Sequence, residues 1–440
     1  MTASTWTTWA RQHQASPDSI LHPKSAQELA RLIQEADRQG QKLKVLGKGR
    51  SSSAIAQPVD QQVTLDYLSG LVSVDQENLT ATFMAGTTIR QANQLLGRYK
   101  LAFANLGRLD NQTLAGAIAT GFHGSGSSYQ IFASQVASFT MLDASGQALT
   151  CSPTENPDIF VAALCGLGAL GVMTQITFRV VPQFRLHAVE RGHAYRDIVH
   201  TFPERARAAD HYKFSWFPGN KEVRTRRLTR LDLLPEGYMP AGSYLSQARR
   251  YGGDHLLNNG LFSAVSYAGA QLPAVQPTLN RVSNWAKGNR RYADYSARVF
   301  TITRTVRQNN MEYAFDMALF DQVMEEVRRY FEREHPVMSY PLVVRTAAAD
   351  QIPLSQAYGR ETFYISARAY WRQDHRQLFS GLEEVFKAYG GRPHWGQFHT
   401  QEAASLAGLY PAFEDFVELR QELDPQGTFL NPYLQRVLLG

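Results

Sequence analysis

The chain has 440 residues, of which 44% are hydrophobic and 19% are charged, so it can bury large cores and is not expected to be disordered. This length suits two domains, or one domain interrupted by another. The formal net charge of +6 could indicate nucleic-acid binding, but no zinc finger, RNA-binding sheet motif or long basic helix accompanies the basic residues between 221 and 307. The charge therefore favours attraction of an anionic substrate or a membrane surface over nucleic acid.

Cysteine usage and the apolar segments indicate the compartment. Cys151 and Cys165 are too few and too far apart for a zinc site or a disulfide framework, which predicts buried thiols in a reducing compartment. The first ten residues have no basic start and no apolar core, so we predict no secretory signal. The most apolar internal segment, residues 261–275, is too short and too polar to span a bilayer. We expect a cytoplasmic protein.

The first predicted elements are a helix, a strand and a glycine turn. The helix starts at the capping box Ser25-Ala26-Gln27-Glu28 and ends at Gly40. A short apolar strand, residues 43–46, follows and leads into the turn GKGRSS, residues 47–52. Glycines after a strand let backbone N–H groups approach phosphate oxygens. The turn does not complete a Walker motif, and no G-x-G-x-x-G opens a helix, so P-loop and nicotinamide interpretations are weak.

The rest of the chain predicts an α+β protein. Alternating apolar residues predict half-buried strands, and a helix is expected from about residue 88 to 99. Segments from about 183 to 390 predict a second domain. The expected strands of the first unit lie around residues 63–65, 72–74, 81–83, 136–142 and 172–181.

A segment of small residues, 104–130, could hold a ligand. Glycine and alanine leave its backbone bare from residue 116 to 126, which suits a long flat ligand lying against the main chain. Thr120, His123 and Ser125 would then be the polar contacts. A tightly packed structural turn explains the same composition equally well.

Several long motifs, in order along nearly the whole chain, resemble the FAD-dependent aldonolactone oxidase and alditol oxidase family of vanillyl-alcohol-oxidase-type flavoproteins. They are HPKSAQELARLIQEA, VLGKGRSS, NLGRLDNQTLAGAIATGFHGSG, LGALGVMTQITF, DQIPLSQAYGRETFYIS, RPHWGQFHT and DPQGTFLNPYLQRVL. The resemblance implies an α+β fold with a two-part FAD-binding domain, residues 1–182 and 398–440, and an inserted α+β substrate (cap) domain, residues 183–397.

The resemblance also implies which residues contact FAD. They lie in the glycine turn, in the small-residue segment and at two later positions: Gly47, Lys48, Gly49, Arg50, Ser51, Ser52, Gly107, Thr113, Gly116, Ala117, Thr120, Gly121, His123, Gly124, Ser125, Gly126, Val172 and His394.

Two of these positions carry specific expectations. Family members have a histidine that bonds to the flavin where this chain has Arg50, and a guanidinium has no free lone pair for that bond. We therefore predict that FAD is held non-covalently. The family places glycine or alanine beside flavin C4a, and here that residue is Gly107. Glycine implies an open path for oxygen, which predicts O2 as the electron acceptor.

The substrate motifs depart from the family pattern at two residues. The family's Glu-x-Arg is Val343-Val344-Arg345 here, and its His-Trp-Gly-Lys is His394-Trp395-Gly396-Gln397. A carboxylate and a lysine that orient a sugar hydroxyl are therefore missing, which argues against an ordinary sugar-lactone oxidase. The resemblance implies a catalytic set of Gly107, Arg345, His394 and Gln397, and substrate contacts at Arg108, Val343, Arg345, Tyr364, Arg368 and Gln397.

Histidine and tyrosine side chains in these motifs could accept a proton or bind a metal. His394 is a candidate base, although a histidine beside tryptophan in a turn is at least as often a packing element. Tyr364 is a weaker candidate. His394 and His399 have no third ligand, so we predict no metal site.

Arginines replace small polar residues around the expected pocket. Arg108 and Arg368 stand at such positions, and Val343 removes the carboxylate that would neutralise Arg345. Unpaired buried cations are costly unless an anion arrives or a carboxylate from elsewhere in the fold intrudes. We therefore predict a small substrate with a carboxylate or phosphate. In the alternative, Arg108 or Arg368 pairs with Asp110, Glu361 or another acid.

Together these observations predict an FAD-dependent oxidoreductase that oxidises a C–OH, or C–N, group of a small anionic substrate by hydride transfer to flavin N5, with O2 as acceptor. Two alternatives remain. One is a flavin dehydrogenase of sugar lactones or polyols with a non-oxygen acceptor. The other is a flavin-binding protein that has lost turnover.

Overall fold

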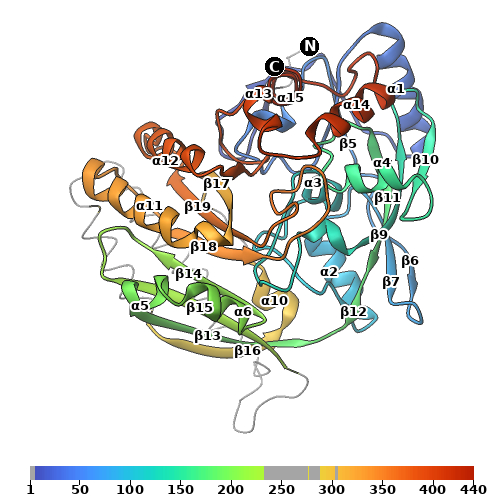
Figure 1. Cartoon of the computed structure of the whole chain (residues 1–440). Coiled ribbons are helices and arrows are strands. Elements are labelled where there is room, and N and C mark those ends of the chain that lie inside the picture. Colours follow the sequence, from blue (N-terminus) through green and yellow to red (C-terminus); the bar gives the residue numbers. More distant parts are fainter. Residues whose placement is uncertain (1–4, 232–275, 277–287, 303–305) are drawn as a thin grey trace.

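The computed structural model describes residues 5–231, 276, 288–302 and 306–440, and Figure 1 shows their arrangement. The predicted apolar segment 261–275 lies outside the described residues. In the described part, no helix is long and apolar enough to cross a membrane.

The first predicted helix is present as α1 (Ala26–Gln39). The Ser25 hydroxyl accepts the Glu28 N–H, and Gly40 ends the helix in the left-handed conformation at φ 66°. Helix α1 connects the parallel strands β3 (Ser19–Leu21) and β4 (Leu43–Leu46), which both pair with β5 (Gln61–Thr64). The glycine turn therefore leaves the end of a buried parallel strand.

An antiparallel sheet forms the rest of the N-terminal part. Among the described residues its strands follow the order β10 (Ala148–Cys151), β9 (Val136–Leu142), β11 (Val172–Arg179), β7 (Thr80–Met84) and β6 (Leu71–Asp75). The short pairs are β1 (Trp6–Thr7) with β2 (Gln14–Ala15), and β8 (Leu101–Ala102) with β12 (Val181–Pro182). The helical elements are η1 (Ala54–Ala56), α2 (Ile89–Arg98), α3 (Leu114–Ala119), η2 (Phe132–Gln135) and α4 (Pro157–Ala163).

A larger antiparallel sheet follows in the chain, and we call it the cap sheet. Its described strands follow the order β16 (Arg290–Tyr295), β13 (Arg185–Ala194), β15 (Glu222–Leu231), β14 (His211–Trp216), β18 (Leu342–Ala347), β19 (Thr362–Tyr370), β17 (Gln308–Asp316) and β20 (Arg392–Pro393). The helical elements around it are α5 (Tyr195–Val199), α6 (Phe202–Arg207), α10 (Ser296–Phe300), η5 (Met317–Leu319), α11 (Phe320–Glu334) and α12 (Arg376–Ala388).

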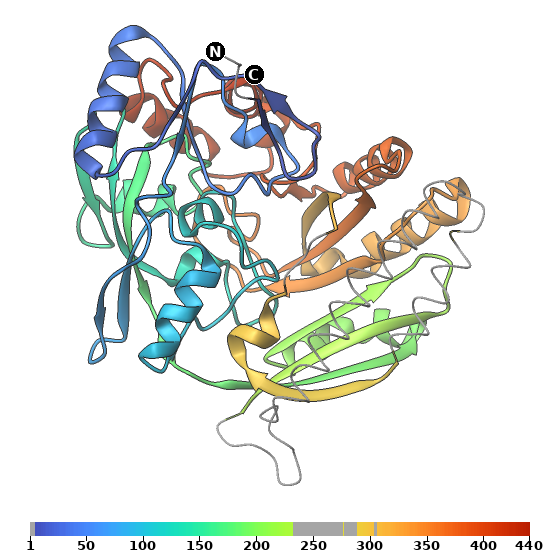
Figure 2. The same ribbon diagram turned by 180° about the vertical axis from the view of Figure 1, so that it is seen from behind.

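Strand alternation gives the cap sheet two different faces. Apolar side chains such as Phe214, Val344 and Ile365 pack with α11 and α12 in one hydrophobic core. The residues that alternate with core residues along the same strands, such as Lys213, Arg345 and Glu312, point to the opposite face because successive strand residues alternate. The His123 ring reaches this second face through its hydrogen bond with Glu312, so this face looks toward the N-terminal part. Figure 2 shows the two parts from behind.

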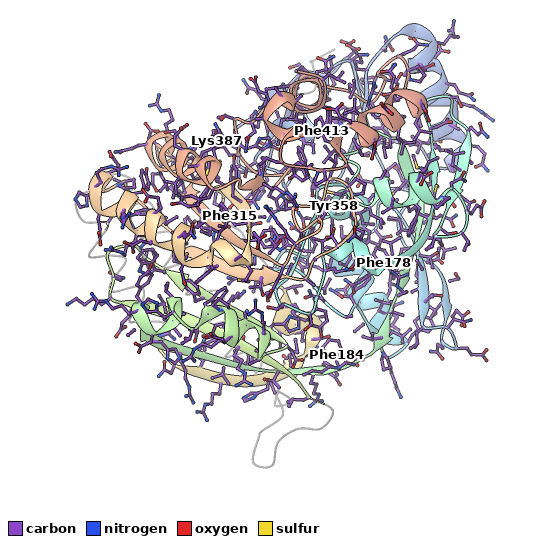
Figure 3. The ribbon with its side chains drawn as sticks, in the orientation of Figure 1. Phe178, Phe184, Phe315, Tyr358, Lys387 and Phe413 are labelled. Atoms are coloured by element: carbon purple, nitrogen blue, oxygen red, sulfur yellow. The ribbon has the colours of Figure 1, made fainter. Side chains whose placement is uncertain are left out.

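The C-terminal segment returns to the N-terminal part. Helices α13 (Ala403–Ala407), α14 (Phe413–Leu423) and α15 (Pro432–Leu438) share a core with α1 and the first two sheets. The Leu43 N–H donates to the Thr428 carbonyl at 2.8 Å, which joins the C-terminal segment to β4. Figure 3 labels Phe178 in this core and Phe315 in the core of the cap sheet.

Candidate active site

A groove runs along the N-terminal part beside the glycine turn. It encloses about 750 Å³, its open mouth included. Four of the predicted cofactor residues line it: Gly47, Thr113, Gly116 and Val172. Its other lining residues are mostly small or apolar: Val45, Leu46, Leu65, Gly86, Ala115, Ala119, Met141, Ala163, Gly166, Gly168, Leu170, Gly171, Met173 and Phe429.

The glycines of this groove are required by close approach. A Cβ on Gly47 would lie 2.5 Å from the Thr113 hydroxyl oxygen, and one on Gly86 would overlap the Leu65 carbonyl. The backbone is therefore bare where the groove is narrowest. A bare, mostly apolar groove suits a long nucleotide cofactor lying against main chain.

Arg50 lies next to Trp9 at the end of the glycine turn. Its guanidinium carbon is 3.9 Å from the centroid of the Trp9 ring. Burial lowers the pKa of Arg50 to about 10, and among the described residues its Nε and Nη2 have no hydrogen-bond partner. Buried donors of this kind normally have acceptors. A cofactor oxygen would satisfy them, so the turn fits FAD.

The remainder of the turn is tied to the HWGQ motif. The Ser52 N–H donates to the Gly396 carbonyl at 2.8 Å, and the Ser53 hydroxyl donates to the Trp395 carbonyl at 2.7 Å. The Ser52 hydroxyl accepts the Asn310 N–H at 3.2 Å. Ser51 also lies close to Gly396, whereas Lys48 pairs with the exposed Asp66 at 2.7 Å. Gly49 has a φ of 59°, which permits the sharp turn.

The small-residue segment connects the groove to the cap sheet. Ala117 is buried in the core, and the Thr120 hydroxyl donates to the Gly116 carbonyl at 3.0 Å. The following residues turn toward the cap sheet, where the Gly126 N–H donates to the Thr346 carbonyl at 3.1 Å. The predicted residues in this bridge are Gly121, whose φ is 68°, His123, Gly124, which packs against Asn105, and Ser125, whose carbonyl contacts the His211 ring.

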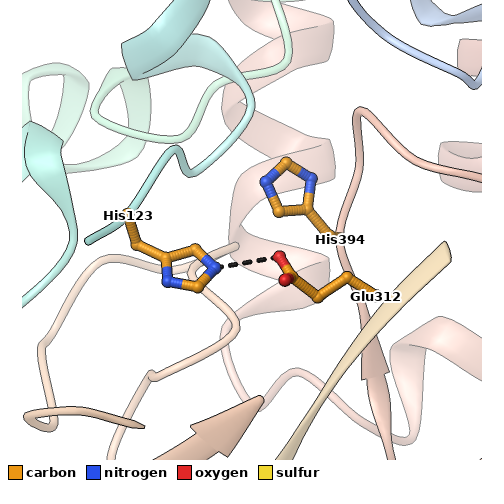
Figure 4. A group of neighbouring side chains, drawn as sticks. All are labelled: His123, Glu312 and His394. Carbon is orange, nitrogen blue, oxygen red and sulfur yellow. Dashed lines mark hydrogen bonds and ion pairs between the residues drawn. The ribbon is translucent and has the colours of Figure 1, made fainter. Parts of the chain in front are cut away.

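A buried carboxylate, Glu312, organises the second face of the cap sheet. Its side chain is fully buried on β17 and accepts hydrogen bonds from His123 Nε2 at 3.0 Å and from Gln397 Nε2 at 3.1 Å. Arg345 on β18 donates to its other oxygen. The His123 ring stacks on Tyr364, with 3.7 Å between centroids. Figure 4 shows His123, Glu312 and His394 converging from three segments.

The charges in this cluster follow from burial and from Arg345. Burial opposes ionisation of Glu312, but Arg345 and then His123 hold the pKa of Glu312 well below its usual range. Burial and then Arg345 lower the pKa of His123. The cluster is therefore an ionised Glu312–Arg345 pair with a neutral His123 donating to the carboxylate.

His394 presents a hydrogen-bond donor to this cluster. Burial lowers the pKa of His394 to about 4, so the ring is neutral at pH 7. The Gly396 N–H donates to His394 Nδ1 at 3.1 Å, which leaves the ring proton on Nε2. In this arrangement His394 can donate to a substrate oxygen. The lone pair that the predicted base would use is occupied by the Gly396 N–H.

The cluster also has the composition of a metal site. Ligand atoms of His123, Glu312 and His394 lie within 4.8 Å of one another. However, Glu312 already accepts from Arg345, His123 and Gln397, and the Arg345 guanidinium would repel a divalent cation. We interpret the group as an ion pair within a hydrogen-bond network.

Of the two ways to neutralise Arg345 that the sequence left open, an anion or a carboxylate from elsewhere in the fold, the structure has the second. Glu312 pairs with Arg345 from two strands away. The signal in the sequence was a glutamate between the apolar residues Met311 and Tyr313, in a segment that reads as a strand. An acid at such a position is buried only when it is paired. The Glu312 carboxylate thus comes from another part of the fold and neutralises Arg345, which would be costly to bury without a partner.

Packing also constrains Gly107, in addition to the predicted role in oxygen access. A Cβ on Gly107 would come within 3.0 Å of the Phe122 ring and of the His123 carbonyl oxygen. Phe122 belongs to the hydrophobic core of the N-terminal part. Glycine is therefore required here by packing, and an alanine methyl would enter the core and not an open channel.

The remaining predicted substrate residues surround the cluster on the same face. Glu312 of β17 and Val343 of β18 are both in register with Ser366 of β19, which lies between them. Tyr364 is fully buried beside His123. Arg368 is buried, with its guanidinium 5.9 Å from the Tyr340 ring, and the Arg108 carbonyl accepts the Ile302 N–H at 2.9 Å. The acids named as alternative partners have other partners: Asp110 pairs with Arg90 and Glu361 with Arg207.

A nucleotide groove joined to a buried ion-pair site under an inserted sheet defines an FAD-dependent oxidoreductase. The D-arabinono-1,4-lactone oxidase family model matches residues 176–437, and an FAD-binding domain model matches residues 17–152. The chain belongs to the D-arabinono-1,4-lactone oxidase family of vanillyl-alcohol-oxidase-type flavoproteins, whose members act on CH–OH groups.

Similar proteins cover the whole chain. L-gulono-1,4-lactone dehydrogenase of Mycobacterium tuberculosis (strain ATCC 25618 / H37Rv) is 33% identical, over 98% of this chain and 99% of its own. L-gulonolactone oxidase of Mus musculus is 29% identical, over 98% and 97%. The crystal structure of cholesterol oxidase from B. sterolicum has a TM-score of 0.82 over 99% of this chain and 96% of its own; at 14% identity it shows the shared fold alone.

Proposed function

We propose that the protein oxidises a CH–OH group of an aldonolactone or a closely related sugar derivative, with FAD held non-covalently and O2 as the electron acceptor. The observation that carries the proposal is the Glu312–Arg345 pair, because it provides a carboxylate and a guanidinium where the family motif has both on one strand. The names of the relatives, L-gulono-1,4-lactone dehydrogenase and L-gulonolactone oxidase, support a lactone as the substrate class.

The residues of the cluster have separate tasks in this reaction. FAD, when bound, supplies the hydride acceptor. His394 Nε2–H and the Arg345 guanidinium are donors that orient the substrate hydroxyl oxygen. As the hydride leaves the carbon, the hydroxyl proton passes to solvent water, and the same donors stabilise the carbonyl oxygen that forms. Glu312 holds Arg345, His123 and Gln397 in place, so the donors are fixed before the substrate arrives. Gln397 can orient a hydroxyl as a neutral group where the family has a lysine.

The test is flavin bleaching under anaerobic conditions. The purified holoenzyme is mixed with L-gulono-1,4-lactone and D-arabinono-1,4-lactone, and the oxidised flavin absorbance is followed. Bleaching with saturation in substrate supports the proposal. Absence of bleaching with lactones and with a panel of sugars and polyols would indicate a flavin-binding protein without turnover.

A second measurement identifies the electron acceptor. After anaerobic reduction the enzyme is mixed with aerated buffer, and flavin reoxidation and peroxide release are recorded. Reoxidation within the turnover time and stoichiometric peroxide support an oxidase. Reoxidation much slower than turnover with a quinone or dye would identify a dehydrogenase, and only the acceptor part of the proposal would then be wrong.

A further inference from the structure

A row of charged side chains crosses the cap sheet beside the active site. The strand register aligns Arg290 of β16, Glu190 of β13, Arg226 of β15, Lys213 of β14 and Arg345 of β18. All five lie on the face that looks toward the N-terminal part, because each alternates with residues of the opposite core. We call these residues the charged row. Neighbouring strands are about 4.8 Å apart, so each side chain in the row lies beside the next.

Both carboxylates near the row already have partners. Glu190 pairs with Arg290 at 2.9 Å and with Arg226 at 3.3 Å, and Glu312 pairs with Arg345. Burial opposes the charge of Glu190, but Arg226 and Arg290 lower its pKa to about 2. Arg226 also donates to the Tyr292 hydroxyl and to the Val299 carbonyl, both at 2.7 Å.

Lys213 is different from the other cations of the row. It lies between Arg226 and Arg345, and it makes no hydrogen bond or ion pair with any residue that the structure describes. Burial, and then Arg226, Arg108 and Arg345, hold the pKa of Lys213 well below its usual range. An ammonium at this position is therefore unfavourable until a negative charge arrives.

A second cation, Arg368, lies on the same face of the cap sheet, on β19 and four residues from Tyr364, which is in register with Arg345. Within the described residues no carboxylate pairs with it. Its exposed fraction is 9%, and within the described residues its Nε has no hydrogen-bond partner. Burial and then Arg108 lower its pKa to about 10. Its recorded contact is the Tyr340 ring. Buried guanidinium donors are normally satisfied, so this arginine also requires an acceptor.

We propose that Lys213, between Arg226 and Arg345, is the centre of an anion-binding subsite of the substrate pocket, with Arg368 as a further cation on the same face, so that the substrate carries a carboxylate or phosphate in addition to the CH–OH group that is oxidised. This inference rests on the proposed function for the oxidised group. Arg345 is occupied by Glu312 and orients the hydroxyl, whereas Lys213, one strand away, binds the anion. The separation of neighbouring strands, about 4.8 Å, places the two substrate groups on different carbons of one small molecule.

The experiment measures anion binding by the oxidised holoenzyme without turnover. Inorganic phosphate and acetate are titrated separately, and dissociation constants are obtained by calorimetry and from the flavin spectrum. A charge-assisted contact contributes enough for Lys213→Met to weaken binding about tenfold to a hundredfold. Lys221→Met, at an exposed position of the same part of the chain, is the matched control and should bind as the wild type does. Lys213→Arg keeps the cation and should retain binding.

The outcomes separate this inference from the proposed function. If the wild-type holoenzyme binds phosphate more tightly than acetate, the substrate is phosphorylated. If it binds acetate more tightly than phosphate, the substrate carries a carboxylate. Equal affinity of the wild type and Lys213→Met for both probes, with FAD content unchanged, would overturn the subsite, as would the absence of binding of either probe. If neutral lactones bleach the flavin but neither anion binds, the subsite alone is wrong. If anions bind through Lys213 but no sugar derivative bleaches the flavin, the proposed reaction alone is wrong.

Discussion

Glu312 and Arg345 form an ion pair although they stand on strands that are not neighbours. Strand β19 lies between β17 and β18, and its residue in register with both Glu312 and Val343 is Ser366. The serine side chain is small enough for the carboxylate of Glu312 to pass over it to Arg345. A carboxylate two strands away thus replaces the one that position 343 lacks.

Removing this carboxylate should slow the reaction, and restoring it at position 343 should recover part of the rate. Glu312→Gln loses a charge-assisted contact of about 1.5–3 kcal/mol, so we expect anaerobic flavin reduction to slow about tenfold to a hundredfold. The double variant Glu312→Gln/Val343→Glu should be faster than Glu312→Gln alone. Glu361→Gln, in a surface pair with Arg207, is the control. Wild-type reduction rates in Glu312→Gln would show that the pair has no role in the reaction.

FAD should leave the polypeptide completely on denaturation. Arg50 occupies the position of the linking histidine, and its guanidinium stacks on Trp9. Such a group cannot form the bond to the flavin. After acid precipitation we expect all of the yellow colour in the supernatant, identified as FAD by chromatography. Flavin that stays on the precipitated chain would contradict non-covalent binding.

Gly107→Ala should destabilise the protein before it affects oxygen. The added methyl overlaps the Phe122 ring, and overpacking of this kind costs about 1–3 kcal/mol. We expect a lower free energy of unfolding and lower FAD content, measured by urea denaturation and absorbance. Gly107→Ala/Phe122→Leu should recover stability, because the smaller side chain makes room. A stable Gly107→Ala variant that differs only in slow reoxidation would instead support the oxygen-path hypothesis.

Stability should fall as the pH falls from about 6.5 to about 4. Burial lowers the pKa of His211 and of His394 to about 4, and that of His399 to about 3. In this window the unfolded chain binds protons at these residues and the folded chain does not, so acid favours unfolding. Each histidine contributes up to about 1.4 kcal/mol per pH unit.

Urea denaturation at several pH values, with FAD in constant excess, checks this prediction. His399→Gln should reduce the slope of the free energy of unfolding against pH by the amount that corresponds to about one proton. His335→Asn is the control, because His335 is exposed at the end of α11 and asparagine tolerates its left-handed backbone. A free energy of unfolding that does not change between pH 6.5 and 4 would contradict the neutral state of these histidines.

Local features of the fold could be predicted from sequence. The capping box at Ser25 and Glu28 predicted α1, and the apolar period predicted a helix from about 88 to 99, where α2 covers Ile89–Arg98. These signals depend on residues a few positions apart. The glycine motifs likewise predicted the cofactor groove, because each is a short continuous stretch.

The substrate site depends on strand order, which a local pattern does not contain. Glu312 meets Arg345 only because β17 lies beside β19 in the cap sheet, and Lys213 meets Arg226 and Arg345 only through the register of three strands. The sequence therefore predicted an excess of arginines in the pocket but not which cation has a partner. The packing of Gly107 could not be predicted for a similar reason, since Phe122 lies beside it through the fold of an irregular loop.

The hydrogen bonds of Ser52 and Ser53 join the cofactor turn to the loop that carries His394 and Gln397. The turn that would contact FAD therefore also holds the loop that would contact the substrate. FAD binding and substrate binding depend on the same hydrogen bonds. By thermodynamic reciprocity, if bound FAD strengthens binding of a substrate analogue through this loop, the bound analogue strengthens binding of FAD by the same factor. Cofactor loading and the order of the substrate loop are then coupled through one turn, because the same residues contact both.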